Sequence, residues 1–405
     1  MSSVVRNRKK GDNTNAPKKE AVAAVEKKEV PPAAQNKEVS AREAKKRTWI
    51  TRTWTTLLMV GAFFGIVYLG HFACVALVVA LMTAVFKELE HVFLIAKPEL
   101  SASHSIRGVS WSLYFVAVYL VLGRIFLATF PEQLFALGEP VRVLARYHYL
   151  ICFCAYSLIF VAFVLTLEAG KYKKQIKQYA WTHLLVVYVV VQTSFWVSNI
   201  FRGLYWFLFP ASLVIVNDVF AFVFGSLLGR TPLIKLSPKK TWEGFIGGAF
   251  STFLWAVGFG ALLMRFPWLT CPKTDLYSWE VAPCAADPAF VPRTFAAFGH
   301  ELVAPPVLVY SIPLAAFASF IAPFGGFFAS GIKRAFSIKD FANIIPGHGG
   351  ITDRMDCQFI MGMFTYLFIN AFVLKPSTSP YVASFLEMDK ATQLEVFNKI
   401  KDLVQ

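Results

Sequence analysis

The sequence has few charged residues for its length. Of its 405 residues, 16% are Asp, Glu, Lys or Arg, whereas 56% are hydrophobic. This excludes an ordinary soluble domain, in which about 25% of residues are charged. It also excludes a disordered chain, because aromatic residues make up 16% of the sequence and disordered chains contain few of them. The composition indicates an integral membrane protein with several spans.

Several motifs that are typical of other classes are absent. The six cysteines include no CxxC pair, which argues against a zinc site. No GxxxxGKS or GxxxxGKT segment occurs, so a nucleotide would not bind through a P-loop. No apolar run closely follows the first basic residues, so we do not expect a secretory signal peptide.

Acidic residues are scarce as well, since 25 Asp and Glu stand against 40 Lys and Arg, a net charge of +15. Residues 1–50 hold 13 of the basic and 6 of the acidic residues, without an apolar run. Such a segment lacks apolar surface to bury. We therefore expect a disordered basic tail that lies in the cytosol and contacts anionic lipid weakly.

Apolar stretches long enough to cross about 30 Å of hydrocarbon recur along the chain. They lie at 54–70, 71–86, 109–128, 147–167, 179–197, 203–224, 244–264, 303–329 and 357–374. The pattern predicts an all-α, polytopic membrane protein with about nine transmembrane helices, give or take one. Its membrane domain covers 51–375, and a C-terminal tail with an amphipathic helix follows at 376–405.

The basic residues predict the orientation. If the N-terminus is cytosolic, the cytosolic connections hold 15 basic residues against six on the opposite side, in agreement with the positive-inside rule. These connections are 87–108, 168–178, 225–243 and 330–356.

The 265–302 loop then lies in the lumen. It contains Cys271 and Cys284, for which a disulfide and two free thiols are both open at this point.

The cytosolic segment 330–356 concentrates polar residues at membrane depth. Ser330, Lys333 and Arg334 are spaced i, i+3, i+4, so they share one helix face. Two cations and a hydroxyl on one face indicate a phosphate-binding site. Asp353 and Asp356 begin the last span and project from one face. Their carboxylates suit Mg²⁺, which typically binds one or two carboxylates plus substrate phosphates.

The glycines of this segment add backbone donors. Gly349 and Gly350 leave the backbone bare, so that its N–H groups can approach an anion. His348 lies beside them. It is expected to organise the loop or to donate a hydrogen bond to a phosphate, in preference to acting as a general base.

The segment 225–248 offers further donors. Ser237, Lys239, Lys240 and Thr241 supply two ammonium groups and two hydroxyls, which indicates a lid or clamp for a polyphosphate. Thr241 is also a suitable N-cap for a helix that opens at Trp242.

Two other features of this region lie within predicted spans. Asp218 falls in the sixth span, where a carboxylate is costly and by default indicates a functional site. Gly244, Gly247 and Gly248 are expected to allow close packing of helices.

Each of these features has a structural explanation when it is taken alone. Basic residues near a span fix orientation, and an Asp at the start of a helix caps it. The convergence of cations, carboxylates and glycines within the 27 residues of 330–356 favours a site for phosphates and Mg²⁺.

These residues resemble the signature of the CDP-diacylglycerol synthase (phosphatidate cytidylyltransferase) family. The run from Ser330 to Asp356 matches every fixed position of that signature, and 237–248 resembles the family's S-P-K-K-T-W-E-G block. Gly326 and Ala329 stand where many bacterial members carry Asp and Glu, which is similar to the eukaryotic branch. Phe222 stands where Tyr is common.

The resemblance implies that the chain transfers the cytidylyl group of CTP to phosphatidic acid, giving CDP-diacylglycerol and pyrophosphate. It implies Mg²⁺ as cofactor, the lipid bilayer as the setting, an endoplasmic reticulum location with a cytosolic active site, a possible homodimer and no nucleic-acid partner. The catalytic residues would be Asp353, Asp356, Lys333, Arg334, Asp340 and His348. Substrate would be bound by Ser237, Lys239, Lys240, Thr241, Ser330, Lys339, Gly349, Gly350 and Arg354, and the metal by Asp353, Asp356 and Asp218.

Two other functions remain as alternatives. A polyprenol or phytol kinase would also use CTP, but it would transfer the γ-phosphate and release CDP. A membrane transporter of anions or nucleotides also carries intramembrane charges and broken helices. The sequence shows no internal hydropathy repeat, which argues against the transporter.

Overall fold

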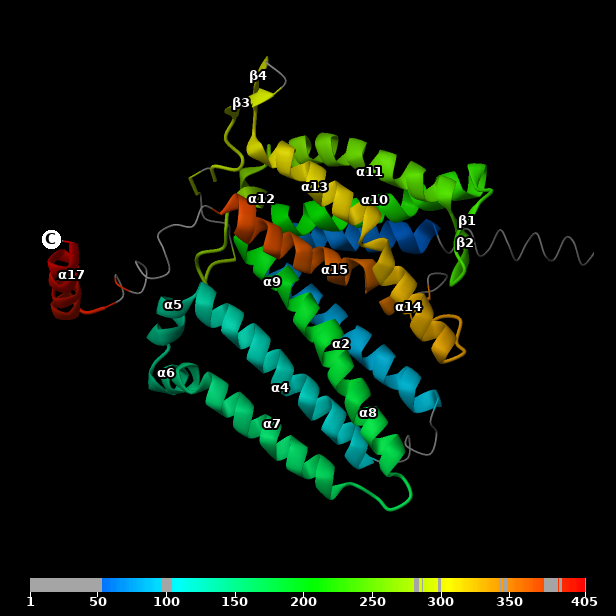
Figure 1. The fold of residues 1–405 in the computed structure, drawn as a ribbon, viewed down its shortest axis with the longest axis horizontal. Coiled ribbons are helices and arrows are strands. Elements are labelled where there is room, and N and C mark those ends of the chain that lie inside the picture. Colours follow the sequence, from blue (N-terminus) through cyan, green and yellow to red (C-terminus); the bar gives the residue numbers. More distant parts are fainter. Residues whose placement is uncertain are drawn as a thin grey trace, which may run out of the picture. The chain divides into compact units, whose positions relative to one another are not determined.

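The computed structural model describes residues 53–96, 104–279, 284–285, 287–297, 300–342, 344, 349–374, 385 and 388–404. The predicted disordered tail at 1–50 lies outside these residues, and so does His348. In the described part, eight helical segments are long and apolar enough to cross a bilayer, and a ninth apolar helix, Thr53–Tyr68, is shorter. This agrees with the predicted all-α membrane fold (Figure 1).

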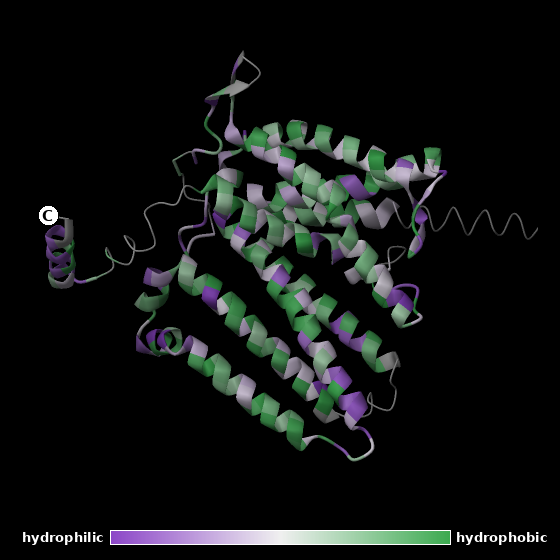
Figure 2. Ribbon diagram, viewed as in Figure 1, coloured by the Kyte–Doolittle hydropathy of each residue, from purple (hydrophilic) through white to green (hydrophobic). Residues whose placement is uncertain are grey.

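The long helices follow one another along the chain. They are α2 (His71–Ala96), α4 (His104–Thr129), α7 (His148–Leu165), α8 (Tyr172–Leu185) continued by η1 (Val186–Val191) and α9 (Gln192–Arg202), α10 (Tyr205–Leu228), α11 (Trp242–Leu263), α13 (Pro306–Phe320), α14 (Pro323–Ala335), and α15 (Thr352–Phe368) continued by η2 (Ile369–Val373). Hydrophobic residues dominate most of these helices, whereas hydrophilic residues lie near β1, β2, the end of α14 and the start of α8 (Figure 2).

Shorter elements join the long helices. They are α5 (Pro131–Ala136), α6 (Glu139–Arg146), α12 (Pro267–Thr270), α17 (Lys390–Val404), and the antiparallel hairpins β1 (Pro232–Ile234) with β2 (Ser237–Thr241) and β3 (Arg293–Ala297) with β4 (His300–Ala304). Neither hairpin was predicted from the sequence. Helix α17 lies within the predicted C-terminal tail.

The second span is longer than predicted. Helix α2 continues to Ala96, past the predicted end of the span at 86 and into the stretch expected to form a cytosolic connection. Glu88 and Glu90 lie in these turns and are both buried, with 4% of their surface exposed. A polar stretch can therefore continue an apolar helix where its carboxylates face protein and not lipid.

Helices α10 and α11 pack closely because glycines leave room. A Cβ atom on Gly244 would lie 2.5 Å from the carbonyl oxygen of Ala221, and one on Gly248 would lie 2.9 Å from that of Asn217. Neither position could hold a larger residue without moving a helix. The predicted role of these glycines in helix packing is confirmed.

Helix α15 is held against α9 by buried polar groups. The indole N–H of Trp196 donates to the carbonyl oxygen of Gln358 (3.0 Å), and the Asn199 amide donates to that of Gly362 (3.0 Å). Hydrogen bonds between buried groups fix both the depth and the rotation of a helix, because a slip would leave these donors without partners. The backbone that carries the carboxylates at the start of α15 is therefore held in position.

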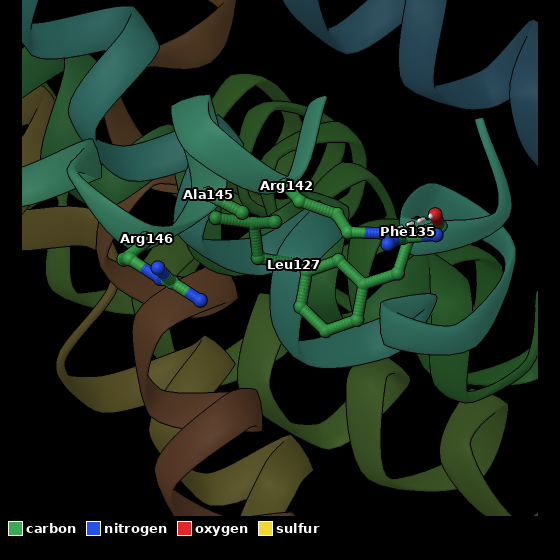
Figure 3. A pocket seen from close by; sticks show the side chains of 5 residues that line it. All are labelled: Leu127, Phe135, Arg142, Ala145 and Arg146. Atoms are coloured by element: carbon green, nitrogen blue, oxygen red, sulfur yellow. Dashed lines mark hydrogen bonds between the residues drawn. The ribbon is translucent and has the colours of Figure 1, made fainter. Parts of the chain in front are cut away.

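At the other end of the bundle, the chain forms a disulfide and a cavity. Cys271 and Cys284 are bonded, which decides between the two alternatives left open by the sequence. A cavity of about 390 Å³ lies where α4 meets α5 and α6, and it is lined by Leu127, Phe135, Arg142, Ala145 and Arg146 (Figure 3). None of the residues predicted to bind substrate or metal lines this cavity.

Candidate active site

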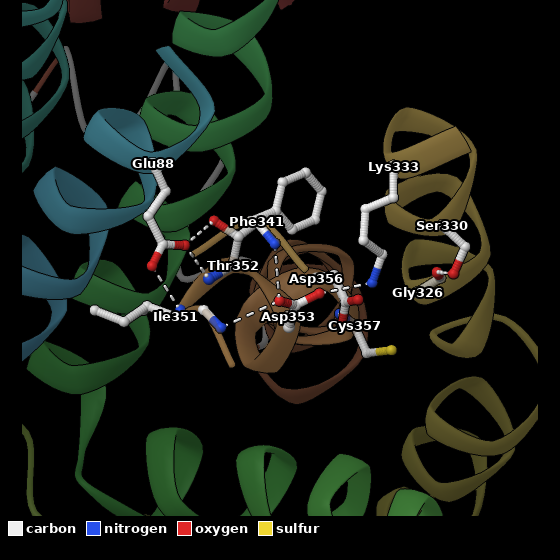
Figure 4. Close-up of polar contacts among 11 residues, drawn as sticks. Glu88, Gly326, Ser330, Lys333, Phe341, Ile351, Thr352, Asp353, Asp356 and Cys357 are labelled. Atoms are coloured by element: carbon white, nitrogen blue, oxygen red, sulfur yellow. Dashed lines mark hydrogen bonds and ion pairs between the residues drawn. The ribbon is translucent and has the colours of Figure 1, made fainter. Parts of the chain in front are cut away.

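The signature residues meet where the end of α14 faces the start of α15 (Figure 4). Lys333 on α14 forms an ion pair with Asp353 on α15, with 2.6 Å between Nζ and Oδ1. Only 16% of the Lys333 side chain and 11% of the Asp353 side chain are exposed, so water screens this pair weakly. Two residues predicted for phosphate and metal thus neutralise each other in this structure.

The second oxygen of Asp353 is engaged as well. Oδ2 accepts backbone N–H groups from Gly350 (3.2 Å) and Phe341 (3.3 Å). One carboxylate therefore joins α14, Phe341, Gly350 and the start of α15. For Asp353 to bind a metal, Lys333 must leave Oδ1.

Glu88, which the sequence analysis did not select, caps α15. Its Oε1 accepts the Ile351 N–H (2.8 Å), and its Oε2 accepts the N–H (2.8 Å) and the hydroxyl (2.7 Å) of Thr352. A carboxylate is favoured at a helix N-terminus because N–H groups there lack partners within the helix. The only sequence signal was a carboxylate beside an apolar span.

A second group of charges lies around Gly326. A Cβ atom on Gly326 would lie 3.4 Å from Asp356 Oδ2 and 3.7 Å from Lys240 Nζ, so both side chains face this glycine. Lys240 Nζ also lies 4.8 Å from the centre of the Phe327 ring. Asp218 interacts electrostatically with Asp356 and Lys240. Residues from α10, β2, α14 and α15 thus converge on one point.

The β1–β2 hairpin brings Lys240 to this point. Thr241 caps α11 by accepting the Gly244 N–H (3.2 Å), which confirms the predicted cap. Glu243, not selected from the sequence, accepts the N–H (3.2 Å) and hydroxyl (2.7 Å) of Thr231 and so closes the base of the hairpin. Side chains alternate along a strand, and Lys240 is half-buried while Lys239 is exposed.

The hairpin also reaches α14. A Cβ atom on Gly331 would lie 3.8 Å from a methyl group of Leu236, which places the hairpin turn beside that helix. The Ser330 hydroxyl donates to the carbonyl oxygen of Gly326 on its own helix (2.8 Å), so only its lone pairs remain for a ligand. Ser237 begins β2 and is half-buried.

Four other predicted residues lie near Lys333 and Asp353 in the chain. They are Arg334, Lys339, Asp340 and Arg354, and all four are exposed. Gly349 has φ +80°, and a Cβ atom there would lie 3.4 Å from Asp353 Oδ2. Such a conformation favours glycine whatever the ligand.

Among the described residues, no three His, Cys, Asp or Glu side chains form a ready metal cluster. Asp218 and Asp356 nevertheless fit Mg²⁺ when substrate supplies the other oxygens, because the two carboxylates interact and Asp356 Oδ2 faces the open Gly326. Asp356 Oδ1 accepts the Cys357 N–H (2.8 Å), which fixes the carboxylate. The third predicted metal ligand, Asp353, has partners on both of its carboxylate oxygens and is therefore less available to a metal ion.

Comparison with known proteins identifies the family of this chain. The model of the cytidylyltransferase family matches residues 50–372. The chain is 46% identical over 346 residues to phosphatidate cytidylyltransferase 1 of Arabidopsis thaliana, covering 83% of this chain and 82% of that protein. It is 38% identical over 398 residues to phosphatidate cytidylyltransferase 1 of Homo sapiens, covering 92% and 84%. The chain therefore belongs to the cytidylyltransferase family.

Proposed function

We infer that this chain is a phosphatidate cytidylyltransferase, which joins CTP and phosphatidate to give CDP-diacylglycerol and pyrophosphate. The observation that carries this inference is the convergence of Lys240, Asp356 and Asp218 from three separate segments, next to the Lys333–Asp353 pair. Cations and carboxylates combined in this way suit two polyanionic substrates and a metal ion. Relatives of that name align over more than four fifths of their own length, 82% and 84%.

The residues present account for the reaction as a displacement. A phosphate oxygen of phosphatidate forms a bond to the α-phosphorus of CTP, and the bond from that phosphorus to pyrophosphate breaks. The lipid phosphate is already ionised near neutral pH, so no general base is needed. The main barrier is repulsion between two anions, and positive side chains lower it.

Each basic residue then has a distinct part. Lys240 is half-buried, faces Gly326 together with Asp356, and would contact the reacting phosphates. Lys333 would exchange Asp353 for a phosphate oxygen when CTP binds. Arg334 and Lys339 are exposed and would hold the outer phosphates.

We propose Asp218 and Asp356 as the residues that hold Mg²⁺. These two carboxylates would hold the ion beside the reacting phosphates, where its positive charge would offset the negative charge that develops on pyrophosphate. Asp353 acts in this proposal by positioning Lys333 and the 341–350 loop.

We further propose that the active site faces the cytosol from the endoplasmic reticulum membrane. The positive-inside count places the β1–β2 hairpin and the 330–356 segment on that side. Phosphatidate would then enter sideways from the cytosolic leaflet, with its acyl chains between spans. A homodimer is proposed on the family resemblance.

The test is to purify the protein in detergent with CTP, phosphatidate and Mg²⁺ and to identify the products. Pyrophosphate and a CDP-lipid support the proposal, whereas CDP and a phosphorylated lipid would support the kinase alternative. Product formed in micelles, without a closed vesicle, excludes transport as the sole activity.

A further inference from the structure

We propose that Glu88 is a positioning residue for the cytidylyltransfer site. Its carboxylate, at the far end of α2, would set where α15 begins and therefore where Asp353 and Asp356 point. This inference rests on the proposed function, because it assumes that the start of α15 carries the chemistry. It concerns a residue that lies 263 positions from its nearest partner in the chain.

Within the described part of the chain, the hydrogen bonds that Glu88 accepts come from Ile351, the N-cap of α15, and from Thr352, its first residue. Three hydrogen bonds of 2.7–2.8 Å reach its two oxygens from Ile351 and Thr352. Glu88 is 4% exposed and Thr352 is 1% exposed, so water does not compete for these donors. Hydrogen bonds to a buried carboxylate are about twice as strong as those between neutral groups.

Gly350 shows that Glu88 and Asp353 hold the same turn from two sides. A Cβ atom on Gly350 would lie 3.0 Å from Glu88 Oε2 and 3.2 Å from Asp353 Oδ2. Asp353 also accepts the Gly350 N–H. The backbone just before α15 is therefore clamped between two carboxylates, and one of these is paired with Lys333.

Glu88 also determines where an anion cannot bind. The N-terminus of a helix is a ready site for phosphate, because its free N–H groups and dipole attract negative charge. Here the carboxylate of Glu88 fills that position on α15. A substrate phosphate is consequently directed to Lys333 and Lys240, which lie beside Asp353 and Asp356.

The same helix supplies a matched control. Glu90 is also 4% exposed, yet its Oε1 has no hydrogen-bond partner within the described part of the chain. Glu88→Gln and Glu90→Gln each remove one buried charge from α2. They differ in that only Glu88→Gln weakens the cap of α15.

The experiment compares these two variants with the wild-type protein by two measurements. Hydrogen exchange of the 349–356 backbone, recorded without CTP or Mg²⁺, reports the order of the clamp independently of activity. The Mg²⁺ concentration for half-maximal activity reports the position of the carboxylates, whereas a merely structural loss lowers the amount of active enzyme without moving this midpoint.

We expect Glu88→Gln to speed exchange of 349–356 and to raise the Mg²⁺ midpoint about tenfold, within the range typical of residues that orient metal ligands. Glu90→Gln should change neither. Wild-type exchange or a wild-type midpoint in Glu88→Gln would overturn the proposal, as would equal effects of the two variants.

A variant that removes fewer hydrogen bonds tests the proposal if Glu88→Gln does not fold. Thr352→Val keeps the carboxylate and both backbone donors and removes one of the three hydrogen bonds. It should raise exchange and the midpoint in the same direction by a smaller factor, and an unchanged midpoint contradicts the proposal. Failure of the function itself would look different, because the wild-type protein would then form no CDP-lipid while the exchange result stood.

Discussion

Lys333 and Asp353 form an ion pair 2.6 Å long that joins the end of α14 to the start of α15. Both residues belong to the family signature. Without the ion pair, Lys333 would attract an anionic substrate and Asp353 would repel it. Paired as they are, they hold the site in shape before CTP arrives. Binding of a phosphate then requires Lys333 to change partner, which couples substrate binding to movement at the α14–α15 junction.

The Lys333–Asp353 pair predicts that substitutions of these two residues have non-additive effects on the free energy of unfolding. Lys333→Met leaves the Asp353 carboxylate without its cation and should cost about 2 kcal/mol of unfolding free energy, below the 3–5 kcal/mol typical of fully buried pairs. Asp353→Asn should cost less. A double-mutant cycle on thermal unfolding checks this, and purely additive effects would contradict a coupled pair.

Lys240 and Lys239 should differ although they are adjacent. Lys240 lies beside Asp356, so Lys240→Gln should lower kcat about a hundredfold, as the loss of a group that stabilises transition-state charge does. Lys239 is exposed, so Lys239→Gln should raise KM for CTP modestly and leave kcat unchanged. Steady-state kinetics at saturating phosphatidate separate the two. Equal losses of kcat would mean that the hairpin does not orient them as described.

Gly326 should be sensitive to any side chain. A Cβ atom there would lie 3.4 Å from Asp356 Oδ2 and 3.7 Å from Lys240 Nζ, so Gly326→Ala should lower activity about tenfold by filling space that both groups face. Gly331→Ala on the same helix is the control, since its Cβ atom would meet only a methyl group at 3.8 Å. Comparable activity of the two variants counts against a role for the Gly326 site.

The disulfide should support stability and not catalysis. Closing the loop between Cys271 and Cys284, 13 residues apart, should contribute about 3 kcal/mol of unfolding free energy. The double substitution of both cysteines by Ser should lower the unfolding temperature and leave kcat within about twofold, because the bridge lies at the other end of the bundle from Lys240. A large loss of kcat at a temperature where the variant stays folded would refute this separation.

Much of this fold follows from local patterns in the sequence. The spans, the Thr241 cap and the glycine-mediated packing of α10 on α11 depend on residues close together in the chain or on runs of one composition. The two hairpins were missed because β1 has only three residues, and β3 and β4 only five each, which is too few for a clear alternation. The end of α2 was missed because charged residues imply a loop unless their burial is known.

The site was only partly predictable for a different reason. The signature identifies Lys333, Asp353 and Asp356, but no local pattern says that Lys333 pairs with Asp353 or that Glu88 caps α15. These contacts join residues 20 and 263 or more positions apart, and they depend on how the helices pack. The structure also shifts the proposed metal ligands toward Asp218 and Asp356, because both Asp353 oxygens already have partners.

The most direct test of the central claim follows the two ends of the CTP triphosphate. The purified protein is given phosphatidate, Mg²⁺ and CTP labelled either at the α- or at the γ-phosphate, beside an Asp356→Asn variant. The proposed reaction predicts α-label in lipid, γ-label in pyrophosphate in equal amount, and loss of both products in the variant. Label from the γ-phosphate in lipid, or full activity of Asp356→Asn, would contradict the account.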